Sequence, residues 1–269
     1  MKLNRKQPIG IFDSGLGGLT VAKAIIQTLP NEKMIYFGDT AHLPYGDKSK
    51  ETIIQYSVRI TEFLMHQQCK AIVIACNSAS ANAFEEVVKK IGKQTLVLNV
   101  IDPVVEYIAT TEYTKIGVIG TKSTIDSGTY TDKINTRKKG ALVLSMATPL
   151  FVPMIEEGFI FDDISNAIIR NYLSRHEISG IDSLILGCTH YPIISNQINR
   201  FYNFEVDIID SGKIIANSLR TMLTENNLLN DASSAKNQFY VSDITRYFKL
   251  IARMFFEEEI ELEKLNLWN

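Results

Sequence analysis

Apolar runs of strand length alternate with amphipathic helical segments along nearly the whole chain. The runs that end just before Cys76 and Cys188 show no polar alternation, which is typical of strands buried on both faces in a parallel sheet. Further strands are expected over residues 8–12, 34–38, 96–101, 115–120, 141–145, 206–209 and 239–242. Helices are expected over residues 18–29, 51–68, 80–91, 149–158, 162–173, 211–224 and 244–257. This order predicts parallel sheets covered by helices.

Two landmarks of the first half recur in the second half at nearly the same spacing. Ile9 in the first strand corresponds to Ile116, an offset of 107 positions (116 − 9). Cys76 corresponds to Cys188, an offset of 112 positions (188 − 76). We interpret this agreement as a duplicated α/β unit. Each cysteine is then expected at the carboxyl end of a central strand, the edge where open α/β sheets bind ligands.

The composition is that of an ordinary soluble globular protein. Of the 269 residues, 45% are hydrophobic and 22% are charged, and the formal net charge is −2. Nothing in this balance favours binding to nucleic acid or to an anionic membrane. No apolar run approaches the roughly 18 residues of a membrane span, and no apolar signal-peptide core follows the N-terminus. Three widely spaced cysteines form no disulfide framework, so we expect a cytoplasmic protein with free thiols.

Cysteine beside a buried strand is most often a small core residue, and this is our interpretation of Cys69. Cys76 and Cys188 differ, because both stand after the apolar run has ended and both are followed by polar residues. Two thiols that face each other across a cleft suit one reaction: a thiolate removes a proton from one face of a carbon, and the other thiol delivers one to the opposite face. A free thiol has a pKa of about 8.5, so it serves as acid and as base near neutral pH.

Three other features carry candidate chemistry with an alternative interpretation beside each. The turn from Asp13 to Gly18 presents backbone N–H groups that suit a carboxylate, and Asp13 either assists a thiol or an ammonium group or merely caps the turn. Glu156 lies near a helix end, where an acid is usually solvent-facing. His190 either exchanges a proton with Cys188 or is a surface residue. No dinucleotide fingerprint or zinc-ligand spacing is present, so we expect neither cofactor nor metal.

Six stretches together resemble the glutamate racemases of the aspartate/glutamate racemase superfamily. They occur in family order, span nearly the whole chain, and cover residues 9–18, 44–46, 75–81, 119–125, 149–158 and 186–192. The resemblance implies cofactor-independent interconversion of L- and D-glutamate, which supplies D-glutamate for bacterial peptidoglycan. It also implies two pseudo-symmetric α/β domains, each a mainly parallel sheet covered by helices, with the active site in the cleft between them.

The resemblance further assigns roles to individual residues. Cys76 and Cys188 would be the two acid/base residues, with Asp13 assisting Cys76, and with Glu156 and His190 assisting Cys188. The residues expected to hold the substrate are Asp13, Ser14, Tyr45, Gly46, Asn77, Ser78, Thr121, Thr124, Thr189 and His190. The first domain would comprise residues 1–98 and 210–269, and the second residues 99–209. A homodimer is the expected assembly.

Three positions depart from the family pattern. Ser78 stands where family members usually carry Thr, so a hydroxyl remains in the expected pocket while a methyl group is lost. Asp102-Pro103-Val104 replaces the usual Glu-Pro-Gly, and Thr148 stands where a Cys is usual. The first departure bears on substrate affinity, and the other two bear on regulation or packing.

Two other functions are kept open. A racemase for aspartate or another acidic amino acid would use the same thiol pair, because the sequence fixes no pocket dimension. A non-catalytic amino-acid-binding protein is of a different class. Such a protein would not need paired thiols, and an exported one would be expected to carry a signal peptide.

Overall fold

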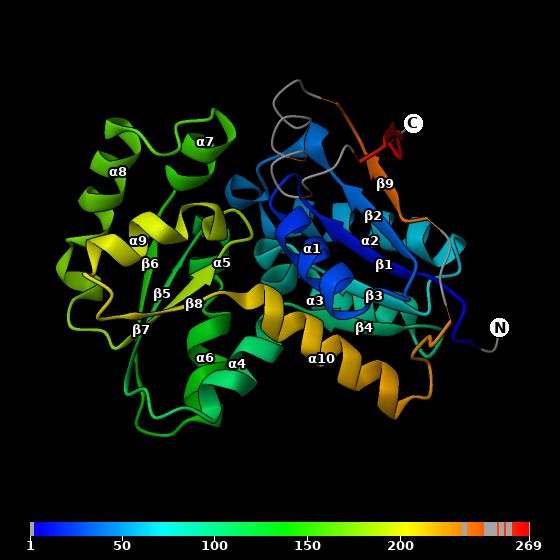
Figure 1. Cartoon of the computed structure of the whole chain (residues 1–269), viewed down its shortest axis with the longest axis horizontal. Helices are drawn as coiled ribbons and strands as arrows, with labels where there is room; N and C mark the ends of the chain where they lie inside the picture. Colours follow the sequence, from blue (N-terminus) through cyan, green and yellow to red (C-terminus); the bar gives the residue numbers. More distant parts are fainter. Residues whose placement is uncertain (1–2, 233–235, 245–251, 253–255, 257–259, 269) are drawn as a thin grey trace.

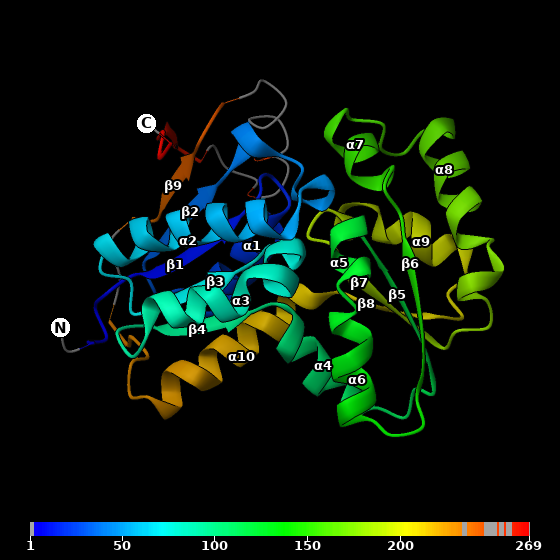
Figure 2. The same cartoon turned by 180° about the vertical axis from the view of Figure 1, so that it is seen from behind.

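Two parallel sheets, each covered by helices on both faces, lie side by side in the computed structural model (Figures 1 and 2). The structure describes residues 3–232, 236–244, 252, 256 and 260–268. The helix expected over 244–257 therefore lies largely outside the described residues. Among the described residues, no helix combines the length and apolar character needed to cross a bilayer.

The first sheet has the order β10-β9-β2-β1-β3-β4 with every pairing parallel. Its strands are β1 (Ile9–Asp13), β2 (Met34–Gly38), β3 (Ala71–Ile74), β4 (Leu96–Asn99), β9 (Gln238–Val241) and β10 (Leu262–Lys264). One face packs on α1 (Gly18–Thr28) and α10 (Ser211–Glu225), and the other on α2 (Lys50–His66) and α3 (Asn77–Ile91). Alternate residues of one strand serve the two faces, since Ile11 faces the first pair of helices and Phe12 the second.

The second sheet has the order β6-β5-β7-β8, again all parallel. Its strands are β5 (Lys115–Gly120), β6 (Leu142–Ala147), β7 (Ser183–Gly187) and β8 (Asp207–Ile209). One face packs on α4 (Ile101–Ala109) and α6 (Thr129–Arg137), and the other on α7 (Phe151–Glu156), α8 (Asp163–Leu173) and α9 (Ser195–Phe201). The short α5 (Lys122–Asp126) follows β5, and four 3₁₀ turns complete the described elements: η1 (Thr40–His42), η2 (Tyr45–Asp47), η3 (His176–Ile178) and η4 (Tyr191–Ile194).

The strand order β2-β1-β3-β4 of the first sheet is repeated as β6-β5-β7-β8 in the second. The α/β class and the parallel sheets predicted from the sequence are thus confirmed, and the shared order agrees with a duplicated unit. In each sheet the first strand in sequence is central, the second strand pairs on one side of it, and the third strand pairs on its other side. In open parallel sheets of this order, ligands usually bind at the carboxyl ends of the two central strands, here β1 with β3 and β5 with β7.

The expected strand over 96–101 is too long at its end, and the helix α4 after it was not expected. The β-branched residues at 97–101 favour a strand, but Asn99 stops it: its Oδ1 accepts hydrogen bonds from the backbone N–H of Ile101 (2.9 Å) and of Asp102 (2.8 Å). Pro103 then stands in the first helical turn, where a missing N–H costs nothing. The short helices α5, α6 and α9 were likewise not expected. The two sheets draw on residues 9–99 with 238–264 and on 115–209, while the exact domain boundaries stay a prediction.

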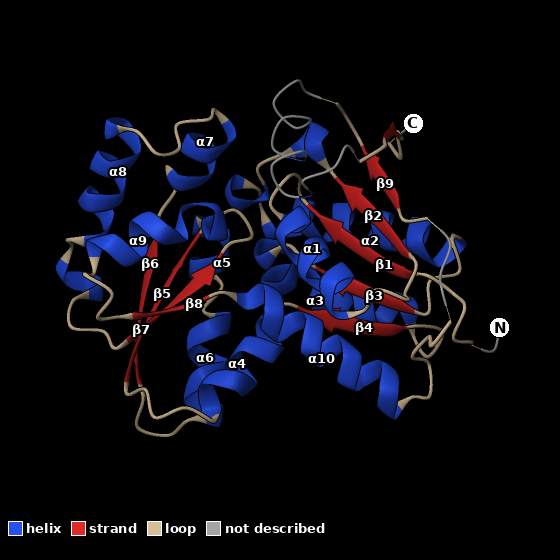
Figure 3. Cartoon of the chain, viewed as in Figure 1, coloured by secondary structure: helices blue, strands red, loops and turns tan. Residues whose placement is uncertain are grey.

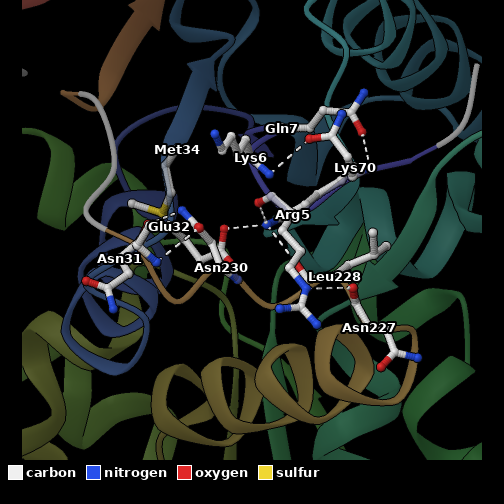
Figure 4. Close-up of polar contacts among 12 residues, drawn as sticks. Arg5, Lys6, Gln7, Asn31, Glu32, Met34, Lys70, Asn227, Leu228 and Asn230 are labelled. Atoms are coloured by element: carbon white, nitrogen blue, oxygen red, sulfur yellow. Dashed lines mark hydrogen bonds and ion pairs between the residues drawn. The ribbon is translucent and has the colours of Figure 1, made fainter.

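A buried ion pair joins four segments at the amino-terminal ends of the strands of the first sheet, remote from the cysteines (Figure 4). Lys70 Nζ donates to Glu32 Oε2 (2.5 Å) and to the carbonyls of Arg5 (2.6 Å) and Leu228 (2.8 Å). The other carboxylate oxygen of Glu32 accepts the N–H of Asn230 (2.8 Å). The side chains of the pair are 0% and 1% exposed. All three ammonium donors are therefore used, as a buried charge requires.

We predict that Lys70→Met destabilises the fold by about 3–5 kcal/mol, because it leaves the Glu32 carboxylate buried and unpaired. The double variant Lys70→Met/Glu32→Leu should recover much of this loss, and urea unfolding measures both. Lys89→Ala, which breaks an exposed pair with Glu86, is the control and should leave the unfolding midpoint unchanged. Equal midpoints for Lys70→Met and Lys89→Ala would contradict the prediction.

Candidate active site

The carboxyl ends of the two sheets point toward the middle of the molecule (Figure 3). Cys76 follows β3 and is the N-cap of α3, with its Sγ accepting the N–H of Ala79 at 3.5 Å. Cys188 follows β7 directly. Helix α3 begins three residues before its predicted start, because the thiol takes the capping role. The two cysteines are only 5% and 6% exposed.

Cys76 is held in its protonated form. Burial, together with the nearby carboxylate of Asp13, raises the pKa of this thiol to about 12, although the N–H of Ala79 and the hydroxyl of Ser14 act in the opposite direction. Its Sγ donates to Ser14 Oγ at 3.8 Å. At neutral pH the Cys76 side chain is therefore a proton donor. Cys69 lies in the core under α2, which confirms its interpretation as a core residue. Burial raises the pKa of its thiol to about 12 as well.

Asp13 caps the glycine-rich turn and also contacts the second sheet's loop. Its Oδ2 accepts the N–H groups of Gly15 (2.9 Å) and Gly18 (3.0 Å), which confirms the capping interpretation. Its Oδ1 accepts a hydrogen bond from Thr189 Oγ1 at 3.3 Å. Asp13 is fully buried, and this burial raises its pKa, although the charge of His190 and the hydrogen bonds oppose the shift. Its assistance to Cys76 stays a prediction.

Gly17 lets this turn approach the second half more closely than any other residue would. A Cβ at this position would lie 2.3 Å from Thr189 Oγ1 and 2.5 Å from His190 Nδ1. No side chain tolerates such distances, so the two halves fit together here only because position 17 is glycine.

His190 links Cys188 to a carboxylate. Its Nδ1 lies 3.8 Å from Cys188 Sγ, and its Nε2 is hydrogen-bonded to Glu156 Oε1. Burial by itself would lower the pKa of this imidazole, but the bonds to Cys188 and Glu156 outweigh it, so the pKa is well above its usual value. Cys188 therefore lies beside a charged imidazolium, and Glu157, the acid that follows Glu156, is exposed.

The loop that carries Tyr45 and Gly46 reaches from the first half to the second. Tyr45 is buried, and its hydroxyl donates to Asp39 Oδ2 at 2.7 Å. A Cβ on Gly46 would lie 2.5 Å from Thr121 Cβ, so this glycine too is needed for close contact. Asp39 was not among the predicted site residues. The signal that points to it is its position directly after β2, at the same sheet edge as Asp13.

Three hydroxyl groups form a cluster between the halves. Ser78 Oγ lies 2.8 Å from Thr121 Oγ1 and 3.3 Å from Thr124 Oγ1, and the two threonine hydroxyls lie 3.0 Å apart. The structure thus brings these predicted substrate-binding residues together. Thr121 is also the N-cap of α5. Each hydroxyl can donate or accept, so the cluster suits a carboxylate that replaces one of these mutual bonds.

Asn77 follows Cys76 and is held from the other half. Its Oδ1 accepts a hydrogen bond from the hydroxyl of Tyr130 at 2.8 Å. Tyr130 was not among the predicted site residues. Thr148, one of the departures from the family pattern, lies 2.7 Å from the Tyr191 hydroxyl by its Oγ1, so it acts in packing behind the site. Among the described residues, no three His, Cys, Asp or Glu side chains are grouped so as to hold a metal ion.

Comparison with known proteins gives consistent matches. The chain matches the family described as Asp/Glu/Hydantoin racemase over residues 9–219. A glutamate racemase of Chlorobaculum parvum is 42% identical over 96% of each chain, and one of Neisseria meningitidis serogroup C is 40% identical over 98% of each. The crystal structure of glutamate racemase from Francisella tularensis in complex with D-glutamate has a TM-score of 0.92 at 40% identity. That match covers 98% of this chain and 99% of the other.

We predict that Glu156→Gln lowers the pKa of His190, because a carboxylate that stabilises the imidazolium is removed. The raised pKa stabilises the fold fully below about pH 6.5, the unfolded value, and this stabilisation is lost as the pH rises through the folded pKa. The unfolded value does not change in Glu156→Gln, so the stabilisation should be smaller in this variant and should be lost completely at a lower pH. NMR titration of the imidazole and urea unfolding at a series of pH values measure it. The exposed neighbour offers the control Glu157→Gln, and an identical His190 titration in both variants would contradict the prediction.

Proposed function

The chain belongs to the Asp/Glu/Hydantoin racemase family, and on this basis we propose that it interconverts L-glutamate and D-glutamate without a cofactor, using two thiols. The observation that carries this proposal is the placement of Cys76 and Cys188 after equivalent strands of two matched sheets. Their different surroundings add support, because one thiol is kept protonated while the other lies beside an imidazole with a raised pKa. A two-base reaction needs these opposite states at its start.

The proposed reaction moves two protons and leaves the carbon skeleton intact. The Cys188 thiolate removes the α-proton, so an S–H bond forms as the Cα–H bond breaks and the electron pair passes into the substrate carboxylate. The Cys76 thiol then gives its proton to the opposite face of Cα. The product has inverted configuration, and the enzyme is left with a Cys76 thiolate and a Cys188 thiol, ready for the reverse direction.

The α-proton of an amino acid is weakly acidic, so the site has to stabilise the negative charge that develops on the carboxylate. The proposed donors are side-chain and backbone groups at Ser14, Asn77, Ser78 and Thr189. The N-terminus of α3 adds its unpaired N–H groups to this set. We assign Asp13 to the Cys76 side, and Glu156 with His190 to the Cys188 side. Tyr45, Gly46, Thr121 and Thr124 would hold the rest of the substrate.

Both thiols are almost fully buried, so we propose that substrate enters when the two halves separate. The contacts between the halves near the thiols are mostly single hydrogen bonds between neutral groups, each worth only about 0.5–1.5 kcal/mol. Ser78 with Thr121, and Tyr130 with Asn77, are examples. Such contacts can break and re-form at modest cost.

The cellular setting and assembly are also proposals. We expect the D-glutamate product to supply bacterial peptidoglycan synthesis, as the family resemblance implies. A cytosolic location would keep Cys76 and Cys188 reduced, as their roles require. A homodimer fits the apolar side chains that the second half exposes, among them Phe159, Phe161 and Phe204. Sedimentation equilibrium would test the assembly.

We predict that Cys76→Ala and Cys188→Ala each reduce glutamate racemisation by about 10²–10⁴-fold or more, because each removes one of the two acid/base groups. Circular dichroism at a fixed glutamate concentration measures the rate, and thermal unfolding checks that the fold is kept. Cys69→Ala removes a thiol outside the site and should stay active. Near-normal activity of either active-site variant would contradict the two-thiol mechanism.

Racemisation in heavy water should place deuterium on the α-carbon of glutamate, since the returning proton comes from a thiol that has exchanged with solvent. Mass spectrometry of the recovered amino acid measures this. A protein that only binds amino acids would leave the α-carbon unlabelled.

L-Aspartate is the matched substrate for specificity. We expect it to racemise at least tenfold more slowly than L-glutamate, because it is one methylene shorter and its second carboxylate would not reach the same donors, a loss of about 1–3 kcal/mol. Equal rates of racemisation would favour a broader acidic amino-acid racemase.

A further inference from the structure

Tyr130 is a buried residue of α6 that is hydrogen-bonded to one cysteine motif and lies close to the other. Its hydroxyl donates to Oδ1 of Asn77, the residue after Cys76, at 2.8 Å. On the other side, a Cβ placed on Gly187, the residue before Cys188, would lie 3.4 Å from Tyr130 Cε2. The tyrosine is 3% exposed. A single side chain of the second half therefore spans the space between the two motifs.

The side-chain amide of Asn77 has a hydrogen-bond partner for its oxygen but none, among the described residues, for its nitrogen. Its side chain is 3% exposed, and its Oδ1 is occupied by the Tyr130 hydroxyl. Its Nδ2 is buried and has no hydrogen-bond partner among the described residues. A buried donor without a partner is costly, so such groups usually serve a ligand or an ordered water. At the first turn of α3, next to Cys76, the ligand in question is the substrate.

We infer that Tyr130 is a positioning residue of the proposed racemase. Its hydroxyl fixes the Asn77 amide with the oxygen toward Tyr130 and the Nδ2 donor toward a substrate carboxylate. This inference rests on the proposed function and adds to it a residue that does not itself touch the substrate.

The chemistry of the two side chains explains why the orientation needs fixing. Rotating an amide by half a turn exchanges oxygen and nitrogen with little change in shape, and the hydrogen-bond partners decide between the two states. A carboxylate only accepts hydrogen bonds, so the wrong state of Asn77 would place two acceptors face to face. Burial raises the pKa of the Tyr130 hydroxyl well above neutrality, so it stays a donor.

The bond also crosses between the halves, because Asn77 follows a strand of the first sheet and Tyr130 follows a strand of the second. The amide is therefore fixed only when the halves are together. Tyr130 in this way couples closure of the site to the correct presentation of the Asn77 donor.

The test compares Tyr130→Phe with Tyr113→Phe. Both changes remove one hydroxyl that makes a 2.8 Å hydrogen bond, but Tyr113 bonds to Asp207 at the start of β8, away from the cysteines. We expect Tyr130→Phe to raise the KM for glutamate about 5- to 10-fold and to lower kcat as well, because the Asn77 donor serves the carboxylate both in the bound substrate and as negative charge develops on it. Tyr113→Phe should match the wild type. An unchanged KM in Tyr130→Phe would overturn the inference.

A second comparison separates positioning from general packing. In an Asn77→Ala background, Tyr130→Phe should change KM by less than about twofold, because the amide through which it acts is absent. The same factor in both backgrounds would overturn the inference. Asn77→Asp keeps the acceptor for Tyr130 and removes the donor, so it should weaken glutamate binding even if Tyr130→Phe folds poorly. Unchanged glutamate affinity of Asn77→Asp would also overturn it.

Calorimetric titration with glutamate, carried out in the inactive Cys76→Ala background, repeats the comparison without turnover. A wild-type protein that binds glutamate but does not racemise it would contradict the proposed function, while the ratio of dissociation constants for Tyr130→Phe and Tyr113→Phe would still decide the role of Tyr130. A ratio of about 5 to 10 supports it, and a ratio of one contradicts it.

Discussion

The close fit between the glycine-rich turn after β1 and the loop after β7 is the constraint on which the rest of the site depends. Gly17 lies against Thr189 and His190 at distances that leave no room for a Cβ. Asp13, at the base of the same turn, bonds to Thr189 across the halves. Because the turn closes over the strand ends in this way, Cys76 and Cys188 are removed from water, and every charge near them acts through a medium of low dielectric.

The two thiols occupy equivalent positions in the two sheets, but their buried surroundings differ. The strand orders of the two sheets are the same, yet Cys76 shares its surroundings with a buried carboxylate and Cys188 with an imidazole that Glu156 supports. Like charge near Cys76 disfavours its thiolate, whereas Cys188 has an imidazolium as its neighbour. A racemase has to work in both directions, and after one turnover the protonation states of the thiols are exchanged. Asp13 and Glu156 stay in place throughout this cycle, so they influence which protonation state of the thiol pair is favoured.

The polar contacts at the far end of the first sheet differ in kind from most of those that join the halves near the thiols. The fully buried pair of Lys70 and Glu32 ties the N-terminal segment to the chain after α10 at the far end of the first sheet. Near the thiols, by contrast, hydroxyl pairs such as Ser78 with Thr121 join the halves. Neutral hydrogen bonds between small side chains exchange readily with water or substrate, so the halves can separate without breaking either sheet.

Local sequence patterns were enough to predict the parallel sheets and to single out Cys76 and Cys188. Strands buried on both faces need continuous apolar residues, and a cysteine after such a run lies at the ligand-binding edge, so both features are local. The helix α4 was missed because Asn99 caps it within a stretch of strand-forming residues. The partners of Asp39 and Tyr130, which are Tyr45 and Asn77, became visible only in the folded structure. Nothing near Tyr130 in the chain distinguishes it, because its partner Asn77 lies 53 positions away and belongs to the other sheet's edge. Contacts between the halves depend on how two folded units dock, and no local pattern encodes that geometry.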